Sequence, residues 1–312
     1  MWEKMRDKFI HELTEIAKVD KNVILITGDL GFGVLDNFVE KFPAQFINAG
    51  VAEQDMTGIS TGMALEGKTV FTYSICNFPT LRCLEQIRND ACYHQANVKI
   101  VAIGGGFCYG PLGISHHATE DLSIMRALPN ITVVAPGDIM EAAAATRAVY
   151  NTSGTCYLRL GRGGGKKVHE RDINFKIGKA IQLFDGDDIA LISTGGILGN
   201  AFKARERLDN IGLSVGLYSM HTLKPFDREI VEDIAERVKL IVTIEEHTLI
   251  GGLGGAVSEI LAQMSQPRAR LQMVGLPGCF SSIVGDQEYL RKVYGMSVEG
   301  IVEKVKGTFE EE

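Results

Sequence analysis

The sequence predicts an α/β protein made of two successive three-layer domains with mainly parallel sheets. Short apolar runs alternate along the chain with segments whose apolar residues recur at helical spacing. Strands that alternate with helices in this way favour parallel sheets covered by helices on both faces. The alternation is interrupted at residues 161–167, a basic, glycine-rich stretch without apolar residues, which indicates the exit from a first domain. We expect domains at residues 1–165 and 188–312, with a linker and a first strand at 166–187.

The first domain should contain strands that alternate with helices. In chain order we expect helices at 3–18, 51–65, 80–94, 119 onward and 138–150, and strands at 22–27, 46–47, 69–73, 98–103, 131–135 and 155–160. In the second domain we expect strands at 180–184, 189–193, 214–218, 240–244 and 271–274, and helices at 199–208, 228–237, 252–264 and 298–305. Residues 185–187, Asp-Gly-Asp, predict a hairpin turn between the first two of these strands. The glycines at 251–255 predict close packing at the start of a helix.

Composition excludes several classes of protein. The chain has 312 residues, 45% of them hydrophobic, and a net charge of −7, which argues against binding to nucleic acid or to a membrane surface. No apolar run is long enough to span a bilayer, and the charged start lacks the core of a signal peptide. None of the six cysteines forms a CxxC pair, so we expect reduced thiols in a cytoplasmic protein and no metal framework.

Glu53 is the strongest candidate for a functional residue. The segment 46–56 predicts a strand, a tight turn and a helix of small and apolar residues, with Glu53 in the first helical turn. A carboxyl group in such surroundings has a raised pKa unless another group pairs with it. The ordinary alternative is a first-turn acid that complements the helix dipole.

Two glycine-rich loops follow strands of the same predicted sheet. One spans residues 28–33 and contains Asp29 and Leu30, whose ordinary alternatives are a turn or cap residue and a core residue. The other spans residues 104–117 and ends in His116 and His117. Ligands of open α/β sheets bind where strands end at their carboxyl edge, so both loops are candidate site elements.

The Gly-Val-Ala-Glu-Gln-Asp-Met sequence at 50–56 resembles the Gly-x-x-Glu-x-x-Met signature of thiamine diphosphate enzymes of the transketolase type. Further blocks match that family in order: Gly-Asp-Leu at 28–30, Phe78 eight residues before Gln86, Ser-His-His-Ala-Thr-Glu-Asp-Leu at 115–122, Tyr-Leu-Arg-Leu-Gly-Arg at 157–162, Leu-Lys-Pro-Phe-Asp at 223–227 and Thr-Ile-Glu-Glu-His at 243–247. The resemblance covers nearly the whole chain. It implies a thiamine-diphosphate pyrimidine-binding domain followed by a transketolase C-terminal domain.

The resemblance also implies a role for each candidate. Glu53 would hydrogen-bond the aminopyrimidine of thiamine diphosphate, Phe78 would stack on that ring, and Asp29 and Leu30 would lie near the thiazole. His116 would be an active-site histidine, and His117 and Arg159 would contact substrate, Arg159 as part of the arginine block that faces a sugar phosphate. Ordinary alternatives are a hydrophobic staple for Phe78 and a buried ion pair for Arg159. For Arg162 we favour a structural or interfacial role.

Part of the family pattern is missing from the sequence. Members of the family bind the cofactor's diphosphate through Mg²⁺ with a Gly-Asp-Gly motif in an N-terminal domain, and no Gly-Asp-Gly occurs here. We therefore expect a separate N-terminal, diphosphate-binding transketolase subunit as partner, a homodimer of this chain alone and a two-plus-two heterotetramer with the partner. The resemblance implies transfer of a two-carbon ketol unit between a ketose and an aldose, as sugars or sugar phosphates. Alternatives are the β subunit of a 2-oxo acid dehydrogenase, a pyruvate-using synthase, and a non-catalytic regulatory remnant.

Two substitutions bear on the substrate. Transketolases usually carry an aspartate four residues before the active-site histidine and a histidine about twelve residues before it, and here these positions hold Leu112 and Gly104. His117 stands where glutamine is usual. Either the ketol donor differs, or the partner subunit, Tyr109 or His117 supplies the missing polar contacts.

Overall fold

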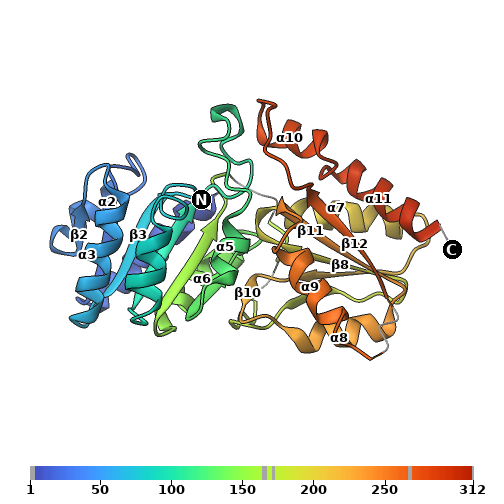
Figure 1. The fold of residues 1–312 in the computed structure, drawn as a ribbon, viewed down its shortest axis with the longest axis horizontal. Helices are drawn as coiled ribbons and strands as arrows, with labels where there is room; N and C mark the ends of the chain where they lie inside the picture. Colours follow the sequence, from blue (N-terminus) through green and yellow to red (C-terminus); the bar gives the residue numbers. More distant parts are fainter. Residues whose placement is uncertain (1–3, 164–166, 171–172, 266–268, 311–312) are drawn as a thin grey trace.

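The computed structural model describes residues 4–163, 167–170, 173–265 and 269–310 and contains two α/β domains side by side, which confirms the predicted fold class (Figure 1). The predicted boundary at residues 165 and 166 lies outside the described residues. Within the described ranges, no helix has the length and apolar character that crossing a lipid bilayer would require.

The first sheet has the strand order β10-β5-β6-β4-β3-β1-β2. Its strands are β1 (Val23–Thr27), β2 (Phe46–Asn48), β3 (Thr69–Ile75), β4 (Val98–Ile103), β5 (Ile131–Val134), β6 (Thr155–Leu160) and β10 (Thr222–Lys224). All neighbours are parallel except β10, which runs antiparallel to β5. Because the parallel strands share one direction, the loops that follow β1, β3, β4 and β6 meet at one edge of the sheet.

Helices cover both faces of this sheet. One apolar layer contains side chains of α1 (Met5–Val19), α2 (Asp36–Lys41) and α6 (Ile139–Asn151). The other contains side chains of α3 (Glu53–Leu65), of α5 (Asp121–Ala127) and of the segment formed by α4 (Leu84–Gln86) and a π-helix at Ile87–Cys92. Burial of both faces explains why apolar residues follow one another in strands such as β1 rather than alternating with polar ones.

The helix predicted at 80–94 is wrong at its start and in its type. Thr80 to Cys83 form turns, in which the Thr80 hydroxyl donates to the Cys76 carbonyl over 2.7 Å, and regular helix begins only at Leu84. It then widens into the π-helix, where Ala96 N donates to the Ala91 carbonyl. The turn keeps Phe78 and Arg82 at the carboxyl edge of the sheet, beside the start of α3.

The second sheet has the order β12-β11-β8-β9-β7. Its strands are β7 (Ile181–Phe184), β8 (Ile189–Thr194), β9 (Val215–Ser219), β11 (Leu240–Thr248) and β12 (Arg270–Leu276). Helices α8 (Arg228–Arg237) and α9 (Leu253–Leu261) pack on one face, and α7 (Leu198–Asp209) and α11 (Val298–Glu310) on the other (Figure 1). The remaining helix, α10 (Gln287–Val293), lies beside the loop 104–120 of the first domain.

The hairpin predicted at residues 185–187 is wrong. The strands on either side of it, β7 and β8, are not neighbours, because β9 lies between them and β7 pairs antiparallel with β9. The chain instead crosses the start of β9, so closely that a Cβ on Gly186 would lie 2.1 Å from the amide nitrogen of Gly216. The glycine of the Asp-Gly-Asp sequence therefore allows two chain segments to cross in close contact.

Strand pairing and hydrogen bonds to the linker contribute to holding the domains together. Strand β10 comes from the second half of the chain but completes the first sheet through its pairing with β5. Asp138 caps α6 by accepting hydrogen bonds from the amides of Met140 and Glu141, and its other oxygen accepts from the amides of Val168 and His169 in the linker. The linker is therefore fixed on the first domain before β7 begins.

Candidate active site

Glu53 is buried at the carboxyl edge of the first sheet, with a side chain only 2% exposed. It opens α3 directly after β2, and the loop that follows β1 packs on it, since a Cβ on Gly28 would lie 3.4 Å from the Cγ of Glu53. The Nη1 atom of Arg82 donates a hydrogen bond to its Oε2 atom over 2.7 Å. Arg82 is thus the group that pairs with this buried carboxylate.

Phe78 lies beside the same carboxyl group. The Arg82 guanidinium stands over its ring, with Cζ 4.7 Å from the ring centroid. On another side, the ring of His116 meets Phe78 edge-on, with centroids 5.2 Å apart. The structure thus brings together Glu53 from the start of α3, Phe78 from the turn after β3 and His116 from the loop after β4.

Asp29 and Leu30 shape the wall behind Glu53. Asp29 has a left-handed backbone (φ 58°), and its amide and carboxylate are both bonded to the side chain of Asn48, over 2.9 and 3.0 Å. Asn48 also accepts from the amide of Gly50, at the turn before α3. Leu30 is held by its carbonyl, which accepts from the Thr27 hydroxyl, and lines an apolar groove of about 490 Å³. The loop that follows β1 and the turn that precedes α3 are therefore joined by hydrogen bonds next to Glu53.

The adjacent histidines have different environments. His116 is half-buried, with its Nδ1 atom 2.9 Å from the Ser115 hydroxyl, and burial lowers its pKa, with a further contribution from His117. His117 is 1% exposed, its ring packs edge-on against Phe107, and its Nε2 atom lies 3.1 Å from the Gly110 carbonyl. A substrate contact, predicted for both, fits the position of His116, whereas the burial of His117 argues for a role inside the loop.

Arg159 occupies a buried ion pair, which was the ordinary alternative for this residue. Its Nε atom donates to Oδ2 of Asp121 over 2.8 Å, and its Nη2 atom donates to the carbonyls of Ala118 and Glu246. Arg159 and Asp121 are 5% and 2% exposed. Arg159 therefore holds the loop that carries His116, and its contact with a substrate stays a prediction.

Tyr109 fills the space that the missing side chain at position 104 leaves. Gly104 has φ 86°, and a Cβ there would lie 2.1 Å from the Tyr109 ring. Arg162 stacks on the other side of this ring, with Cζ 4.6 Å from its centroid, and the His116 ring is 6.0 Å away. Burial raises the pKa of Tyr109, so its hydroxyl is protonated near neutral pH. Leu112, in the same loop, is 55% exposed.

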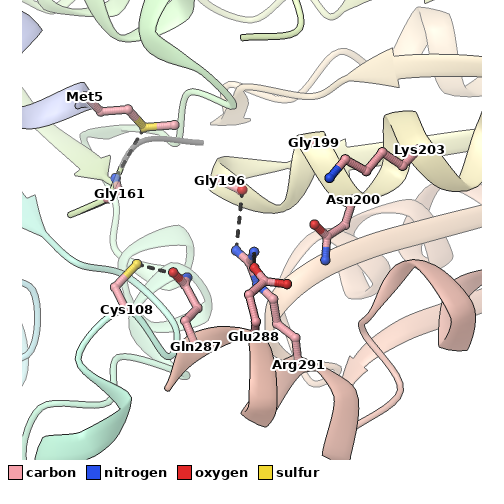
Figure 2. A pocket seen from close by; sticks show the side chains of 11 residues that line it. Met5, Cys108, Gly161, Gly196, Gly199, Asn200, Lys203, Gln287, Glu288 and Arg291 are labelled. Atoms are coloured by element: carbon pink, nitrogen blue, oxygen red, sulfur yellow. Dashed lines mark hydrogen bonds and ion pairs between the residues drawn. The ribbon is translucent and has the colours of Figure 1, made fainter. Parts of the chain in front are cut away.

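The loop 104–120 is anchored on the second domain by Glu246. This buried carboxylate accepts from the Phe107 amide over 2.6 Å, from Gln287 over 2.9 Å and from Nε of Arg291 over 2.7 Å. A polar cavity of about 240 Å³ lies between the domains next to this network (Figure 2). Arg291, Gln287 and Glu288 of α10 and Lys203 of α7 face it, and Gln287 also bonds the Cys108 sulfur across the interface (Figure 2).

Two residues of this arrangement, Arg82 and Glu246, were missed as parts of the site. The only local signal for Arg82 was its position four residues after Phe78, and Glu246 stood out only as part of the block at 243–247. Among the described residues, no three His, Cys, Asp or Glu side chains are grouped so that they could hold a metal ion.

The structure thus places a buried glutamate, an aromatic ring and a histidine at the carboxyl edge of a mainly parallel sheet, where ligands of open α/β sheets bind. The family described as "Transketolase, pyrimidine binding domain" matches residues 4–166, and the one described as "Transketolase, C-terminal domain" matches residues 178–301. The chain belongs to the transketolase family.

Three similar proteins extend this result. One of the subunits of the apulose-4-phosphate transketolase of Phocaeicola vulgatus is 35% identical, over 95% of this chain and 94% of that protein. The "Putative transketolase C-terminal section" of Methanocaldococcus jannaschii is 37% identical, over 98% and 96%. A solved structure described as "Split gene transketolase, inactive beta4 tetramer" superposes with a TM-score of 0.90 at 32% identity and covers 99% of both chains.

Proposed function

We propose that this chain is the C-terminal, pyrimidine-binding subunit of a split, thiamine-diphosphate-dependent transketolase. It would transfer a two-carbon ketol unit between a ketose and an aldose, as sugars or sugar phosphates. The observation that carries the proposal is the convergence of Glu53, Phe78 and His116 at one sheet edge. Relatives described as a transketolase subunit and a transketolase section match the chain over nearly its whole length, which favours this function over a pyruvate-using enzyme.

The residues present fit the aminopyrimidine of thiamine diphosphate. The space between Glu53 and Phe78 already holds the guanidinium of Arg82, a flat group that donates an N–H to the carboxylate and lies on the aromatic face. An aminopyrimidine offers the same two interactions when its ring nitrogen and Glu53 share a proton, because its flat ring can also lie on the Phe78 face. When bound, thiamine diphosphate supplies the carbanion chemistry of ketol transfer.

The residues of this chain have separate tasks in the proposal. Glu53 holds a hydrogen bond to a ring nitrogen and controls where its proton resides, which requires burial and a fixed position. The Asp29–Asn48 pair and Leu30 hold the wall next to it. His116, whose pKa is lowered, is neutral near pH 7 and can both donate and accept a hydrogen bond at the substrate. Tyr109 and Phe78 exclude water from the space around it.

The diphosphate and Mg²⁺ are assigned to a separate N-terminal subunit. The family resemblance places their ligands in an N-terminal domain, and the relatives matched along their whole length are described as a subunit or a section. We propose a homodimer of the isolated chain and a two-plus-two heterotetramer with the partner, because closed twofold assemblies are the commonest. The similar structure described as an inactive β4 tetramer is consistent with a chain that needs another subunit for activity, although its description gives a tetramer where we propose a homodimer.

The surroundings of His116 support a substrate with an anionic group. Arg162 is exposed and stacked on Tyr109, whose ring fills the space that a side chain at position 104 would need. A guanidinium held in this way binds phosphate in two-point fashion. In this proposal Arg162, rather than the buried Arg159, contacts the phosphate of a sugar phosphate.

The exposed position of Leu112 gives a specific prediction about the ketol donor. Leu112→Asp should improve kcat/KM for ordinary ketose phosphates by about 1–3 kcal/mol in transition-state free energy, the scale of a restored polar contact. Steady-state kinetics of the reconstituted complex measure this. Ile114→Asp, at another exposed apolar position of the loop, is the matched control and should give no gain. An unchanged or lower kcat/KM for Leu112→Asp would show that the loop is built for a different donor.

Reconstitution with an N-terminal subunit tests the proposed function. The chain is mixed with an N-terminal transketolase subunit from the same organism, thiamine diphosphate and Mg²⁺, and supplied with ketose phosphates or pyruvate as donor. Turnover of a ketose donor with an aldose acceptor is expected. Turnover of pyruvate alone would favour the 2-oxo acid or synthase alternative, and no turnover with any donor would favour a regulatory remnant.

A further inference from the structure

Arg82 makes both of the contacts that the proposed function assigns to the aminopyrimidine. Its Nη1 atom donates to Oε2 of Glu53 over 2.7 Å, and its Cζ atom lies 4.7 Å above the Phe78 ring. One flat group therefore donates a hydrogen bond to the Glu53 carboxylate and covers the face of the Phe78 ring at the same time. A second flat ring cannot occupy the same face while Arg82 remains there.

The backbone of Arg82 is fixed, whereas its side chain is free to leave. The Arg82 carbonyl accepts a hydrogen bond from Nε2 of Gln54, one residue after Glu53, which ties the turn to α3. The side chain is 47% exposed, while Glu53 is 2% exposed. Rotation of the guanidinium into solvent would open the space on Phe78 without disturbing the core, but it would leave Glu53 buried without its counter-charge.

We propose that Arg82 is a placeholder for the aminopyrimidine: it satisfies Glu53 and covers Phe78 in the free subunit and is displaced when the cofactor enters. The inference rests on the proposed function, because it takes Glu53 and Phe78 as the aminopyrimidine site. Loading of the cofactor is then an exchange: the Arg82 cation moves into solvent, one proton is taken up from water, and that proton is shared between Glu53 and the ring nitrogen in place of the Arg82 N–H. Arg82 is a positioning residue that keeps the empty half-site stable and lowers its affinity for the cofactor ring.

Removal of the Arg82 guanidinium should change binding and stability in opposite directions. Arg82→Met should raise the affinity of the chain for 4-amino-2-methylpyrimidine about five- to tenfold, because no ion pair has to be broken. The same variant should lower the Tm of the free chain at pH 7, because the Glu53 carboxylate stays buried without a partner. A substitution with a merely structural effect would lower the Tm without any gain in affinity.

Two variants serve as controls. Arg88→Met removes an exposed arginine whose Nη1 atom bonds only the adjacent Asn89 side chain in the structure, and it should leave both quantities unchanged. Arg82→Lys keeps the positive charge beside Glu53, so it should retain most of the wild-type Tm and stay close to wild type in binding. Glu53→Gln combined with Arg82→Met should lose the gain in affinity, which ties the gain to the carboxylate.

Ligand-observed NMR titrations of the full chain and thermal unfolding provide the two readouts. An affinity of Arg82→Met equal to or below that of the wild type would overturn the placeholder, as would an unchanged Tm. Failure of the proposed function has a separate signature: the wild-type chain reconstituted with the N-terminal subunit would not bind thiamine diphosphate. If that complex binds the cofactor while Arg82→Met shows no gain in affinity for the pyrimidine, the proposed function is retained and the placeholder role of Arg82 is rejected.

Discussion

Replacement of Glu53 by glutamine should abolish most activation of the cofactor and leave the fold intact. Glutamine has the shape of glutamate, and its carbonyl oxygen can still accept from Arg82, so the free chain should keep its structure. An amide, however, cannot exchange a proton with a ring nitrogen. We expect deuterium exchange at the thiazolium carbon of the bound cofactor to slow by about 10²- to 10⁴-fold, the usual contribution of a positioned acid or base.

Hydrogen–deuterium exchange of the cofactor in the reconstituted complex measures this effect. Asp55→Asn is the matched control, since Asp55 is an exposed acid in the same first turn of α3. In the Asp55→Asn complex the cofactor should exchange at the wild-type rate. If Glu53 only complemented the helix dipole, both variants should have similar, small effects on the exchange rate. A wild-type exchange rate in the Glu53→Gln complex would contradict the assignment.

Loss of the Arg159 guanidinium should have the largest effect on stability. Asp121 is buried, and besides Arg159 it accepts from the Tyr157 hydroxyl over 2.6 Å. Burial alone would raise the pKa of Asp121, but the Arg159 charge, helped by His247 and Tyr157, outweighs it and holds the pKa below its ordinary value of 3.8. Arg159→Met would leave this carboxylate buried without its counter-charge, at a cost of about 3–5 kcal/mol in the free energy of unfolding.

Urea unfolding at pH 7 tests the prediction. Because the folded pKa of Asp121 is lowered, the stabilisation by the pair is complete above the ordinary carboxyl pKa and is lost as the pH falls below it, so the deficit of Arg159→Met should shrink below about pH 4. Arg228→Met, which removes an exposed pair with Glu232, is the control and should cost about 0.5 kcal/mol or less. Equal losses in the two variants would mean that Arg159 does not stabilise its loop.

The parts of the fold that the sequence predicted depend on local pattern and burial. Strands such as β1 are buried along their whole length, and Val23 to Ile26 appear as an uninterrupted apolar run. Strand β10 has three residues and exists because it pairs with β5 from the other domain, which no local pattern indicates. The hairpin at 185–187 failed for a similar reason: a turn sequence shows that the chain bends, but not which strand lies next to which.

The candidate site also contains residues that the sequence predicted and residues that it did not. Glu53 and His116 were predictable because their residue types stand at the ends of strands in a family pattern. The pairing of Arg82 with Glu53 was not, because it joins side chains 29 positions apart across a turn that was predicted as helix. Burial of Arg159 and His117 depended on loop packing against Glu246 and Phe107, so the sequence could not tell which arginine or histidine is accessible.

The central claim is that this chain holds only the aminopyrimidine half of the cofactor site. Titration calorimetry with thiamine diphosphate and Mg²⁺, on the chain alone and on its complex with the N-terminal subunit, tests it most directly. The chain alone should bind weakly, because the diphosphate and Mg²⁺ contribute much of the affinity, and the complex should bind tightly and gain Tm from excess cofactor. Binding by the chain alone at micromolar levels or below, about −8 kcal/mol or better, would contradict the account.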